Sequence, residues 1–328
     1  MLLLNQQQVE TLLDLERLIE ALAPAMVDLS TGAVSMPQRV VTPVPGEDGL
    51  LADMPVYVPS AGALSSKLVT VYPHNPQQGL PGHQALVLLF DPTTGTPLVL
   101  MDGTAITAMR TAAGSALATR LLARPESEVL VIVGAGVQAW SHTLAMPRVR
   151  PIRKMRIVAR DEHKGRVFAR RAAETLGIPA GYFDSFAAAA DGADIICATT
   201  HSAEPVVFGG LVQPGTHINS VGLAYRGREL DAEAVLRSLV VVESRKAALA
   251  DGHGGAYDLK IPIAEGLITA DHLRAEIGEI LAGEREGRSS PDQITLYKSV
   301  GVALQDAVAA GLVYQAALEQ GTGIELDF

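Results

Sequence analysis

The chain has 328 residues, 48% of them hydrophobic and 19% charged, which is enough for two folded domains and a sizeable core. Its net charge of −10 offers no basic field for phosphates, so no nucleic-acid partner is expected. The start MLLLNQQQVETLL lacks the cationic segment of a secretory signal, and no apolar run reaches the roughly 18 residues that span a bilayer. We therefore expect a cytoplasmic protein without a membrane partner.

Short apolar runs separated by turn residues dominate the first third of the chain. Apolar residues recur at helical spacing between 6 and 28, which predicts one amphipathic helix. The following runs predict strands of one sheet: LLADMPVYV (50–58), SKLVTVYP (66–73), HQALVLLFD (83–91) and TPLVLMD (96–102). The segment DPTTG (91–95) predicts a hairpin turn between the last two strands.

Strands and helices alternate strictly from residue 129 to about 245. A helix rich in small residues, TAITAMRTAAGSALATRLLA (104–123), precedes this region. The apolar runs VLVIV, MRIVA, DIICATT, THINSVG and LVVVES predict parallel strands covered on both faces, as in a Rossmann-type, doubly wound α/β sheet. The last apolar segment, 293–320, predicts one long helix that returns to the first domain.

The single cysteine, Cys197, excludes an intrachain disulfide and a cysteine-based zinc site. It lies in the apolar run DIICATT, so we expect a buried, unreactive thiol. No metal site is predicted.

The segment VLVIVGAGVQAWSHTLAM (129–146) predicts a dinucleotide site. Its glycines follow an apolar strand and open a helix, and a second strand, MRIVA, ends about 25 residues further on. Gly134 would allow the tight turn, Gly136 would let the backbone approach a pyrophosphate, and Ala139 would allow close helix packing. The N–H groups at the helix start would then bind the phosphates.

The end of the second strand bears on the type of dinucleotide. NAD-binding proteins place an acidic residue there to hold the ribose hydroxyls, but this chain has IVARDEH with Ala159 at that position. Arg160 favours the 2′-phosphate of NADP(H), whereas Asp161 leaves NAD(H) open. We expect NADP(H) to be preferred.

Five further motifs occur in one order along nearly the whole chain. They are PQRVV (37–41), SKLVTVYPHNP (66–76), AMRTAAGSALATRLLA (108–123), GAGVQA (134–139) and YKSVGVALQD (297–306). With these motifs the chain resembles the ornithine cyclodeaminase and μ-crystallin family, which includes ketimine reductases and certain alanine dehydrogenases. The resemblance implies a homodimer with a substrate-binding and dimerisation domain (1–112 and 300–328) and a Rossmann domain (113–299).

The same resemblance assigns roles to individual residues. Arg39, Lys67 and Arg110 match positions that hold the substrate carboxylate, and Lys67 also matches the position near the reacting carbon. Guanidinium groups bind carboxylates bidentately, and a lysine near other cations can exchange a proton near neutral pH. Besides Gly134, Gly136 and Arg160, the residues implied for the cofactor are Arg110, Thr111, Val137, Gln138, Thr199, Val221, Gly222 and Ser299.

One segment departs from the family pattern. Ornithine cyclodeaminase has an aspartate just after the glycine that corresponds to Gly222, whereas this chain continues as LAYRGRELD. The first carboxylates are Glu229 and Asp231, which we expect to be structural. The departure disfavours ring closure with loss of ammonia.

The most consistent function is that of an NAD(P)H-dependent imine reductase or amino-acid dehydrogenase. His74, His83 and Arg226 could accommodate a second carboxylate, as in iminosuccinate giving aspartate, or could be ordinary loop residues. The alternatives are a cyclodeaminase-type lyase with tightly bound NAD, and a non-catalytic, crystallin-like NADPH-binding protein. A protein that only bound NADPH would not need Lys67, which argues against the crystallin-like alternative.

Overall fold

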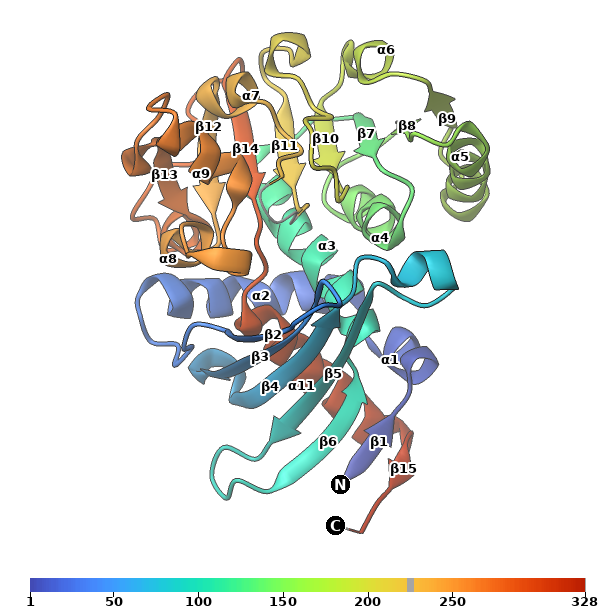
Figure 1. Cartoon of the computed structure of the whole chain (residues 1–328), viewed down its shortest axis with the longest axis vertical. Coiled ribbons are helices and arrows are strands. Elements are labelled where there is room, and N and C mark those ends of the chain that lie inside the picture. Colours follow the sequence, from blue (N-terminus) through green and yellow to red (C-terminus); the bar gives the residue numbers. More distant parts are fainter. Residues whose placement is uncertain (223–226, 328) are drawn as a thin grey trace. The chain divides into compact units, whose positions relative to one another are not determined.

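The computed structural model describes residues 1–222 and 227–327, and the chain forms two compact units (Figure 1). Unit 1 comprises 1–110 and 302–328, and unit 2 comprises 111–301. These boundaries lie close to the predicted ones at 112 and 300. No helix in the described part of the chain is long and apolar enough to cross a membrane. The cytoplasmic location stays a prediction.

Unit 1 is built on a seven-stranded sheet with the order β15-β1-β6-β5-β4-β3-β2. Its strands are β1 (Leu2–Leu4), β2 (Val40–Val44), β3 (Gly49–Val58), β4 (Ala63–Val71), β5 (His83–Phe90), β6 (Pro97–Asp102) and β15 (Ile324–Glu325). The four predicted strands are confirmed as β3 to β6, which pair antiparallel with one another in chain order, whereas β6 pairs parallel with β1 on its other side. The predicted hairpin turn is also present, with Gly95 in the left-handed region at φ 73°.

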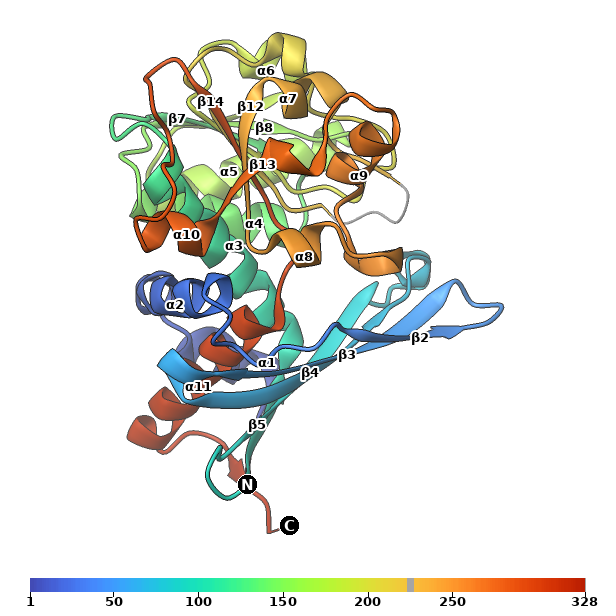
Figure 2. The ribbon, with the colours of Figure 1, turned by 90° about the vertical axis from the view of Figure 1, so that its left-hand side faces the viewer.

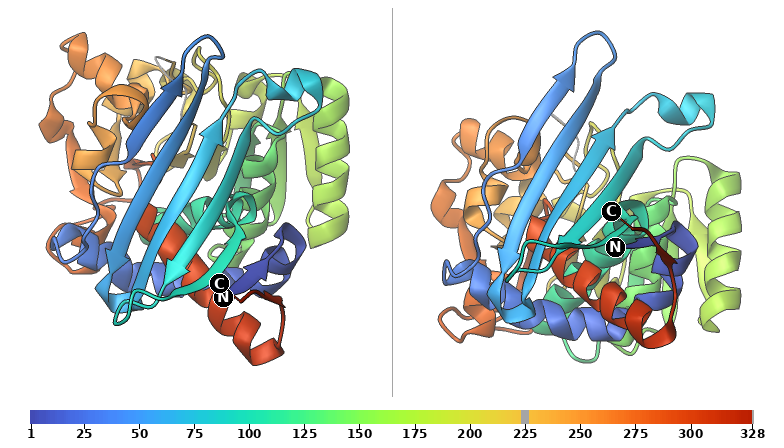
Figure 3. Two further views of the ribbon diagram at one scale, coloured as in Figure 1. Left: turned by 60° about the horizontal axis from the view of Figure 1, so that its bottom comes forward. Right: turned by 90° about the horizontal axis from the view of Figure 1, so that it is seen from below.

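Helices cover one face of this sheet, as Figure 2 shows for α2 and α11. They are α1 (Gln6–Leu12), α2 (Leu15–Ser30) and α11 (Ala303–Gln320), and α11 contacts β3, β4 and β5. The prediction of one helix over 6–28 is wrong, because the side chain of Asp14 accepts a hydrogen bond from Arg17 N and starts a second helix. Figure 3 views the strands from the side opposite to these helices.

Unit 2 contains an eight-stranded, fully parallel sheet with the order β13-β12-β14-β11-β10-β7-β8-β9. The strands are β7 (Val129–Val133), β8 (Lys154–Val158), β9 (Ala180–Phe183), β10 (Ile195–Ala198), β11 (His217–Ser220), β12 (Ser238–Val242), β13 (Leu273–Glu276) and β14 (Ile294–Lys298). The predicted Rossmann-type, doubly wound sheet is therefore confirmed.

The helices of unit 2 connect these strands. They are the second half of α3 (Gly103–Leu122), α4 (Val137–Ala145), α5 (Glu162–Leu176), α6 (Phe186–Ala190), α7 (Ala232–Leu236), α8 (Arg245–Ala248), α9 (Tyr257–Ala264) and α10 (Ile277–Leu281). Single 3₁₀ turns occur at Pro59–Ala61, Asn75–Gln78, Met146–Arg148, Gly209–Leu211, Gly252–Gly254 and Ala270–His272. The predicted burial of the Cys197 thiol is confirmed, and this burial raises the pKa of the thiol to about 12.

The prediction of one helix over 293–320 is wrong in its first part. Residues Ile294–Lys298 form β14, which pairs with β11 and β12 inside the sheet. A strand buried on both faces has no alternation of polar and apolar residues, so its pattern resembles that of a buried helix. Gly301, at φ 72°, separates this strand from α11.

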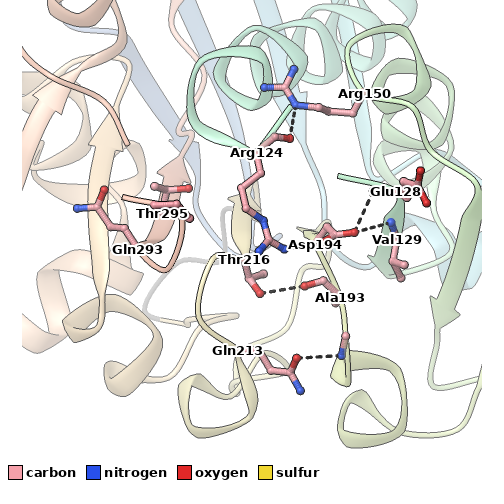
Figure 4. Close-up of polar contacts among 12 residues, drawn as sticks. Arg124, Glu128, Val129, Arg150, Ala193, Asp194, Gln213, Thr216, Gln293 and Thr295 are labelled. Atoms are coloured by element: carbon pink, nitrogen blue, oxygen red, sulfur yellow. Dashed lines mark hydrogen bonds and ion pairs between the residues drawn. The ribbon is translucent and has the colours of Figure 1, made fainter. Parts of the chain in front are cut away.

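Asp194 ties together the start of β7 and the end of α3 (Figure 4). One carboxylate oxygen accepts hydrogen bonds from Glu128 N and Val129 N, each at 2.9 Å, and the other contacts Arg124 Nη2 at 2.6 Å. The Arg150 guanidinium donates to backbone carbonyls around the C-terminus of α3, including that of Arg124. This cluster is structural.

Replacing Asp194 by alanine should lower the free energy of unfolding by about 2 kcal/mol, because two backbone N–H groups and a partly buried guanidinium lose their acceptor. Thermal unfolding followed by circular dichroism would report the change as a lower Tm. Asp191→Asn, at an exposed position nearby, is the matched control. A Tm equal to that of the control would contradict the role given to Asp194.

Candidate functional site

Unit 1 carries a buried cluster of charged side chains around Asp306. Lys67 Nζ lies 2.8 Å from Asp306 Oδ2, and Arg110 Nε lies 3.1 Å from Asp306 Oδ1. All three residues are buried. One carboxylate therefore accepts hydrogen bonds from two cations, and the cluster carries a net positive charge.

The strand and helix patterns explain how these residues meet. Lys67 lies opposite Met54 and Val87 in the strand pairing, among apolar side chains of the sheet face that α11 covers. Asp306 is in the first turn of α11, where the helix dipole favours a negative charge. Lys67 and Asp306 are 239 positions apart in the chain.

Gln305 holds the other side of the Arg110 guanidinium. Its side-chain oxygen accepts a hydrogen bond from Arg110 Nη1 at 2.9 Å, and it also lies 3.4 Å from Val302 N. Because the guanidinium is held at both Nε and Nη1, its orientation is set before any ligand binds.

The pKa of Lys67 is lowered from 10.5 to about 8. Burial is the largest cause, and the positive charges of Arg110 and Arg39 lower the pKa further, while Asp306 opposes them. A lysine with this pKa can both donate and accept a proton near neutral pH.

Asp306 remains ionised within the cluster. Burial alone would raise the pKa of its carboxyl group, but Arg110 and Lys67 outweigh that effect and hold the pKa below the ordinary value. The negative charge therefore persists beside the lysine through the whole range in which Lys67 titrates.

The structure thus brings Lys67 and Arg110 together, and Arg39, just before β2, lies near enough to influence the pKa of Lys67. Asp306 and Gln305 were not predicted, although they end the motif YKSVGVALQD. Both residues lie inside the helix predicted over 293–320, so their side chains were not considered as parts of a site. An acidic residue in an apolar helical stretch was the signal that could have indicated a buried partner for a cation.

The pH dependence of turnover should follow the Lys67 ammonium. If this group donates a proton during imine reduction, the rate should be constant below pH 8 and fall about tenfold per pH unit above it. Oxidation of the amino acid needs the neutral amine and should rise through the same pH. Initial rates in both directions between about pH 6 and pH 10 test this. Rates that stay constant through pH 8 up to the end of this range, as expected for a lysine with the ordinary pKa of 10.5, would contradict it.

Of the residues that were considered for a second substrate carboxylate, His74, His83 and Arg226, the structure does not bring either histidine together with Lys67. His74 Nε2 lies 3.6 Å from Asp48 Oδ2, and both side chains are mostly exposed. His83 opens β5 opposite Val71. Neither histidine is among the groups that shift the pKa of Lys67. Arg226 lies outside the described residues.

Unit 2 carries the glycine loop between β7 and α4. Gly134 has φ 124°, and a Cβ there would lie 2.7 Å from Thr199 Oγ1, so glycine is required for both conformation and space. A Cβ on Gly136 would meet nothing within 4 Å. The protein therefore leaves open the place where a pyrophosphate would approach the backbone.

The start of α4 fits an anionic group. Gly136 is the N-cap residue and has no side chain to satisfy the N–H groups of the first turn, which includes Val137 and Gln138. Val137 is exposed, whereas Ala139 is fully buried against the sheet. The N–H groups at the start of a helix and the helix dipole together favour a phosphate here.

The segments after the neighbouring strands are held by buried carboxylates. Thr199 Oγ1 donates to Val133 O at 2.8 Å and closes the gap between β7 and β10. Ser299 Oγ donates to Glu243 Oε1 at 2.5 Å, and Gly222 N donates to Glu229 Oε1 at 2.7 Å. Val221 is bonded through its N–H to Ala198 O, and Thr111 is buried in α3.

At the end of β8, Arg160 is exposed, as its predicted contact with a ligand requires. Asp161 is the N-cap of α5, and its side chain accepts a hydrogen bond from Lys164 N at 2.9 Å. One oxygen of this carboxylate is therefore already used within the protein.

Comparisons with known proteins identify the relatives of this chain. A model of the ornithine cyclodeaminase/mu-crystallin family matches residues 1–321. Δ(1)-pyrroline-2-carboxylate reductase of Bacillus cereus is 38% identical, with 100% of each chain covered. The structure of Thermococcus litoralis Δ(1)-pyrroline-2-carboxylate reductase in complex with NADH and L-proline has a TM-score of 0.95 and 41% identity, covering 99% of this chain and 100% of that one. The iminosuccinate reductase of Paracoccus denitrificans in complex with NAD⁺ has a TM-score of 0.90 and 27% identity, covering 100% of this chain and 99% of that one.

Proposed function

The chain belongs to the ornithine cyclodeaminase/mu-crystallin family, and from that premise we propose that it is an NAD(P)H-dependent reductase of α-imino acids. The observation that carries this function is the buried contact between Lys67 and Asp306, with the pKa of Lys67 lowered to about 8. A protein that only bound a dinucleotide would have no use for a lysine whose proton is this mobile.

The residues of unit 1 have separable tasks in this reaction. The guanidinium groups of Arg110 and Arg39 bind the carboxylate of the imino acid. A bound NAD(P)H supplies the hydride that reduces the imine carbon. The Lys67 ammonium donates a proton to the imine nitrogen, and Asp306 keeps Lys67 and Arg110 in place. In amino-acid oxidation the neutral amine of Lys67 takes the proton back.

A cyclic imino acid of the Δ(1)-pyrroline-2-carboxylate type is the leading substrate. The Bacillus and Thermococcus relatives named for this compound are 38% and 41% identical over nearly the whole chain. Iminosuccinate is a second candidate, supported by the Paracoccus reductase at 27% identity, and His83 at the start of β5 is the residue proposed to contact its second carboxylate.

The decisive experiment follows absorbance of the reduced nicotinamide with a panel of imines. The panel comprises Δ(1)-pyrroline-2-carboxylate, and oxaloacetate, pyruvate or glyoxylate with ammonia or methylamine. Reduction of the cyclic imine with one NAD(P)H consumed per product supports the proposal. Faster reduction of the oxaloacetate imine would favour the dicarboxylic substrate. Release of ammonia from ornithine with NAD⁺ present but without net reduction of NAD⁺ would instead establish a cyclodeaminase.

We also propose that Arg160 lets the chain use NADPH. Ala159 provides no carboxylate for the ribose hydroxyls, and the Asp161 side chain is engaged at the start of α5. The Thermococcus and Paracoccus structures, which contain NADH and NAD⁺, support NAD(H) as the alternative cofactor. Arg160→Ala should raise KM for NADPH but not for NADH. Equal effects on both KM values would remove this role.

The outer face of the sheet in unit 1 supports a homodimer. Val40, Leu51, Leu68 and Leu86 are 63%, 40%, 45% and 48% exposed. Val40, Leu68 and Leu86 lie in one row across β2, β4 and β5, with Asp53 between them. Exposed apolar side chains on one sheet face, even with one carboxylate among them, support the proposal of an interaction surface. Light scattering should give the mass of a dimer, and Leu68→Glu with Leu86→Glu should give monomers.

A further inference from the structure

Glu229 joins two segments of unit 2 that follow neighbouring strands. Its Oε2 accepts hydrogen bonds from Thr200 N and Thr200 Oγ1, both at 3.0 Å. Its Oε1 accepts from Gly222 N at 2.7 Å and from Ser220 Oγ at 2.8 Å. Thr200 follows β10, and Gly222 follows β11. Glu229 is almost completely buried, so water does not compete for these bonds.

A buried ion pair holds Glu229 itself in place. Asp258 Oδ1 accepts hydrogen bonds from Glu229 N and Leu230 N, while its other oxygen lies 2.8 Å from Lys298 Nζ. Lys298 Nζ also donates to Gly222 O at 2.6 Å and to Ser220 Oγ at 3.0 Å. The segment after β11 is therefore held through both its N–H and its carbonyl groups.

Only a carboxylate suits this position. Every group that meets the two oxygens is a donor, whereas a glutamine would present one NH₂ group to a pair of donors. Space is equally restricted, since a Cβ on Gly222 would lie 2.3 Å from Thr200 O and 2.6 Å from the Glu229 carboxylate. The two segments approach as closely as their backbones allow.

The place of these segments in the sheet points to the dinucleotide. Ligands of parallel α/β sheets bind beyond the carboxyl ends of the strands. In the order β11-β10-β7 the Thr200 segment stands beside β7, whose loop fits a pyrophosphate, and the Gly222 segment stands one strand further along the same edge. We propose that Glu229 is a positioning residue that holds the Thr200 and Gly222 segments against the nicotinamide half of the cofactor. This role rests on the proposed use of NAD(P)H.

The test compares Glu229→Gln with Glu233→Gln, an exposed control in the same unit. The single tryptophan, Trp140, lies on α4 directly after the glycine loop, so energy transfer from it to NADH measures Kd without turnover. Glu229→Gln should raise this Kd about tenfold and lower kcat about tenfold or more, with KM for the imino acid within about twofold. The isotope effect on kcat with NADH deuterated at the transferred position should increase.

Thr200→Val provides a second, milder variant, because it removes the hydroxyl donor but keeps the backbone N–H. It should shift Kd and kcat in the same direction, by about threefold. A purely structural role predicts a lower Tm for Glu229→Gln with Kd, kcat per folded enzyme and the isotope effect unchanged, and that result would overturn the proposal. If Glu229→Gln does not fold, an unchanged Thr200→Val variant overturns it instead.

The proposed reductase activity and the proposed role of Glu229 can be refuted independently of each other. NADH binding without turnover of any imine would refute the reductase, and Kd would still decide the role of Glu229. Absence of NADH and NADPH binding by the unmodified protein would overturn both.

Discussion

Replacing Lys67 by methionine should lower kcat for imine reduction about a thousandfold while leaving Kd for NADH within about twofold. Methionine keeps most of the side-chain volume in the apolar environment of β4 but removes the proton that the imine nitrogen must receive. The fold should tolerate the change, although Asp306 then has Arg110 as its remaining cationic partner. Steady-state rates and the energy transfer from Trp140 measure the two quantities.

Lys67→Arg separates proton transfer from charge. Arginine keeps the positive charge beside Asp306 but does not release its proton near neutral pH. The kcat of Lys67→Arg should therefore fall nearly as far as that of Lys67→Met, and the change in rate at about pH 8 should disappear. Lys246→Met, at an exposed position, is the matched control. Turnover by Lys67→Met at more than about a tenth of the normal rate would refute the role of Lys67 as proton donor.

Asp306→Asn should produce the second large effect, lowering kcat/KM about a hundredfold and the free energy of unfolding by about 3 kcal/mol. The neutral amide leaves two buried cations without their counter-charge. The pKa of Lys67 should then fall further below 8, because Asp306 is the group that raises it. The reductive pH limb should therefore move to lower pH.

Asp48→Asn is the matched control, since Asp48 is exposed and its positive φ of 49° suits asparagine. The pH profile distinguishes an electrostatic effect of Asp306→Asn from simple instability. Circular dichroism at each pH gives the folded fraction, and a change in the pKa of Lys67 alters the shape of the profile of rate per folded enzyme. An unshifted limb would mean that Asp306 does not control the proton on Lys67.

Local patterns were sufficient for the parts of the fold that depend on near neighbours. The run VLVIV, followed by Gly134 and Gly136, predicted β7, the turn and α4, because a tight turn of this type needs glycine at a positive φ. The four antiparallel strands of unit 1 were equally visible from their composition and from the DPTTG turn. In contrast, Asp14 divides the first helix, and an acidic residue in a helical stretch does not reveal by itself that it caps a new helix.

Burial and long-range pairing decided what the sequence could not. The segment ITLYK was predicted as helix, since strands covered on both faces have no polar alternation, and only its pairing with β11 and β12 makes it a strand. Glu229 was expected to be structural, and which segments it joins, those of Thr200 and Gly222, becomes visible only when β10 and β11 lie side by side.

The sequence by itself determined the class of protein: the glycine loop, the alternation of strands and helices, and the motifs with Arg39, Lys67 and Arg110 depend on residues close together in the chain. The tertiary structure decided the chemistry of the lysine. Lys67 meets Asp306 across 239 positions, and its pKa of about 8 results from burial and from the charges of Arg110, Arg39 and Asp306. A pKa responds to distance and solvent exclusion in space, and neither is encoded in residue spacing.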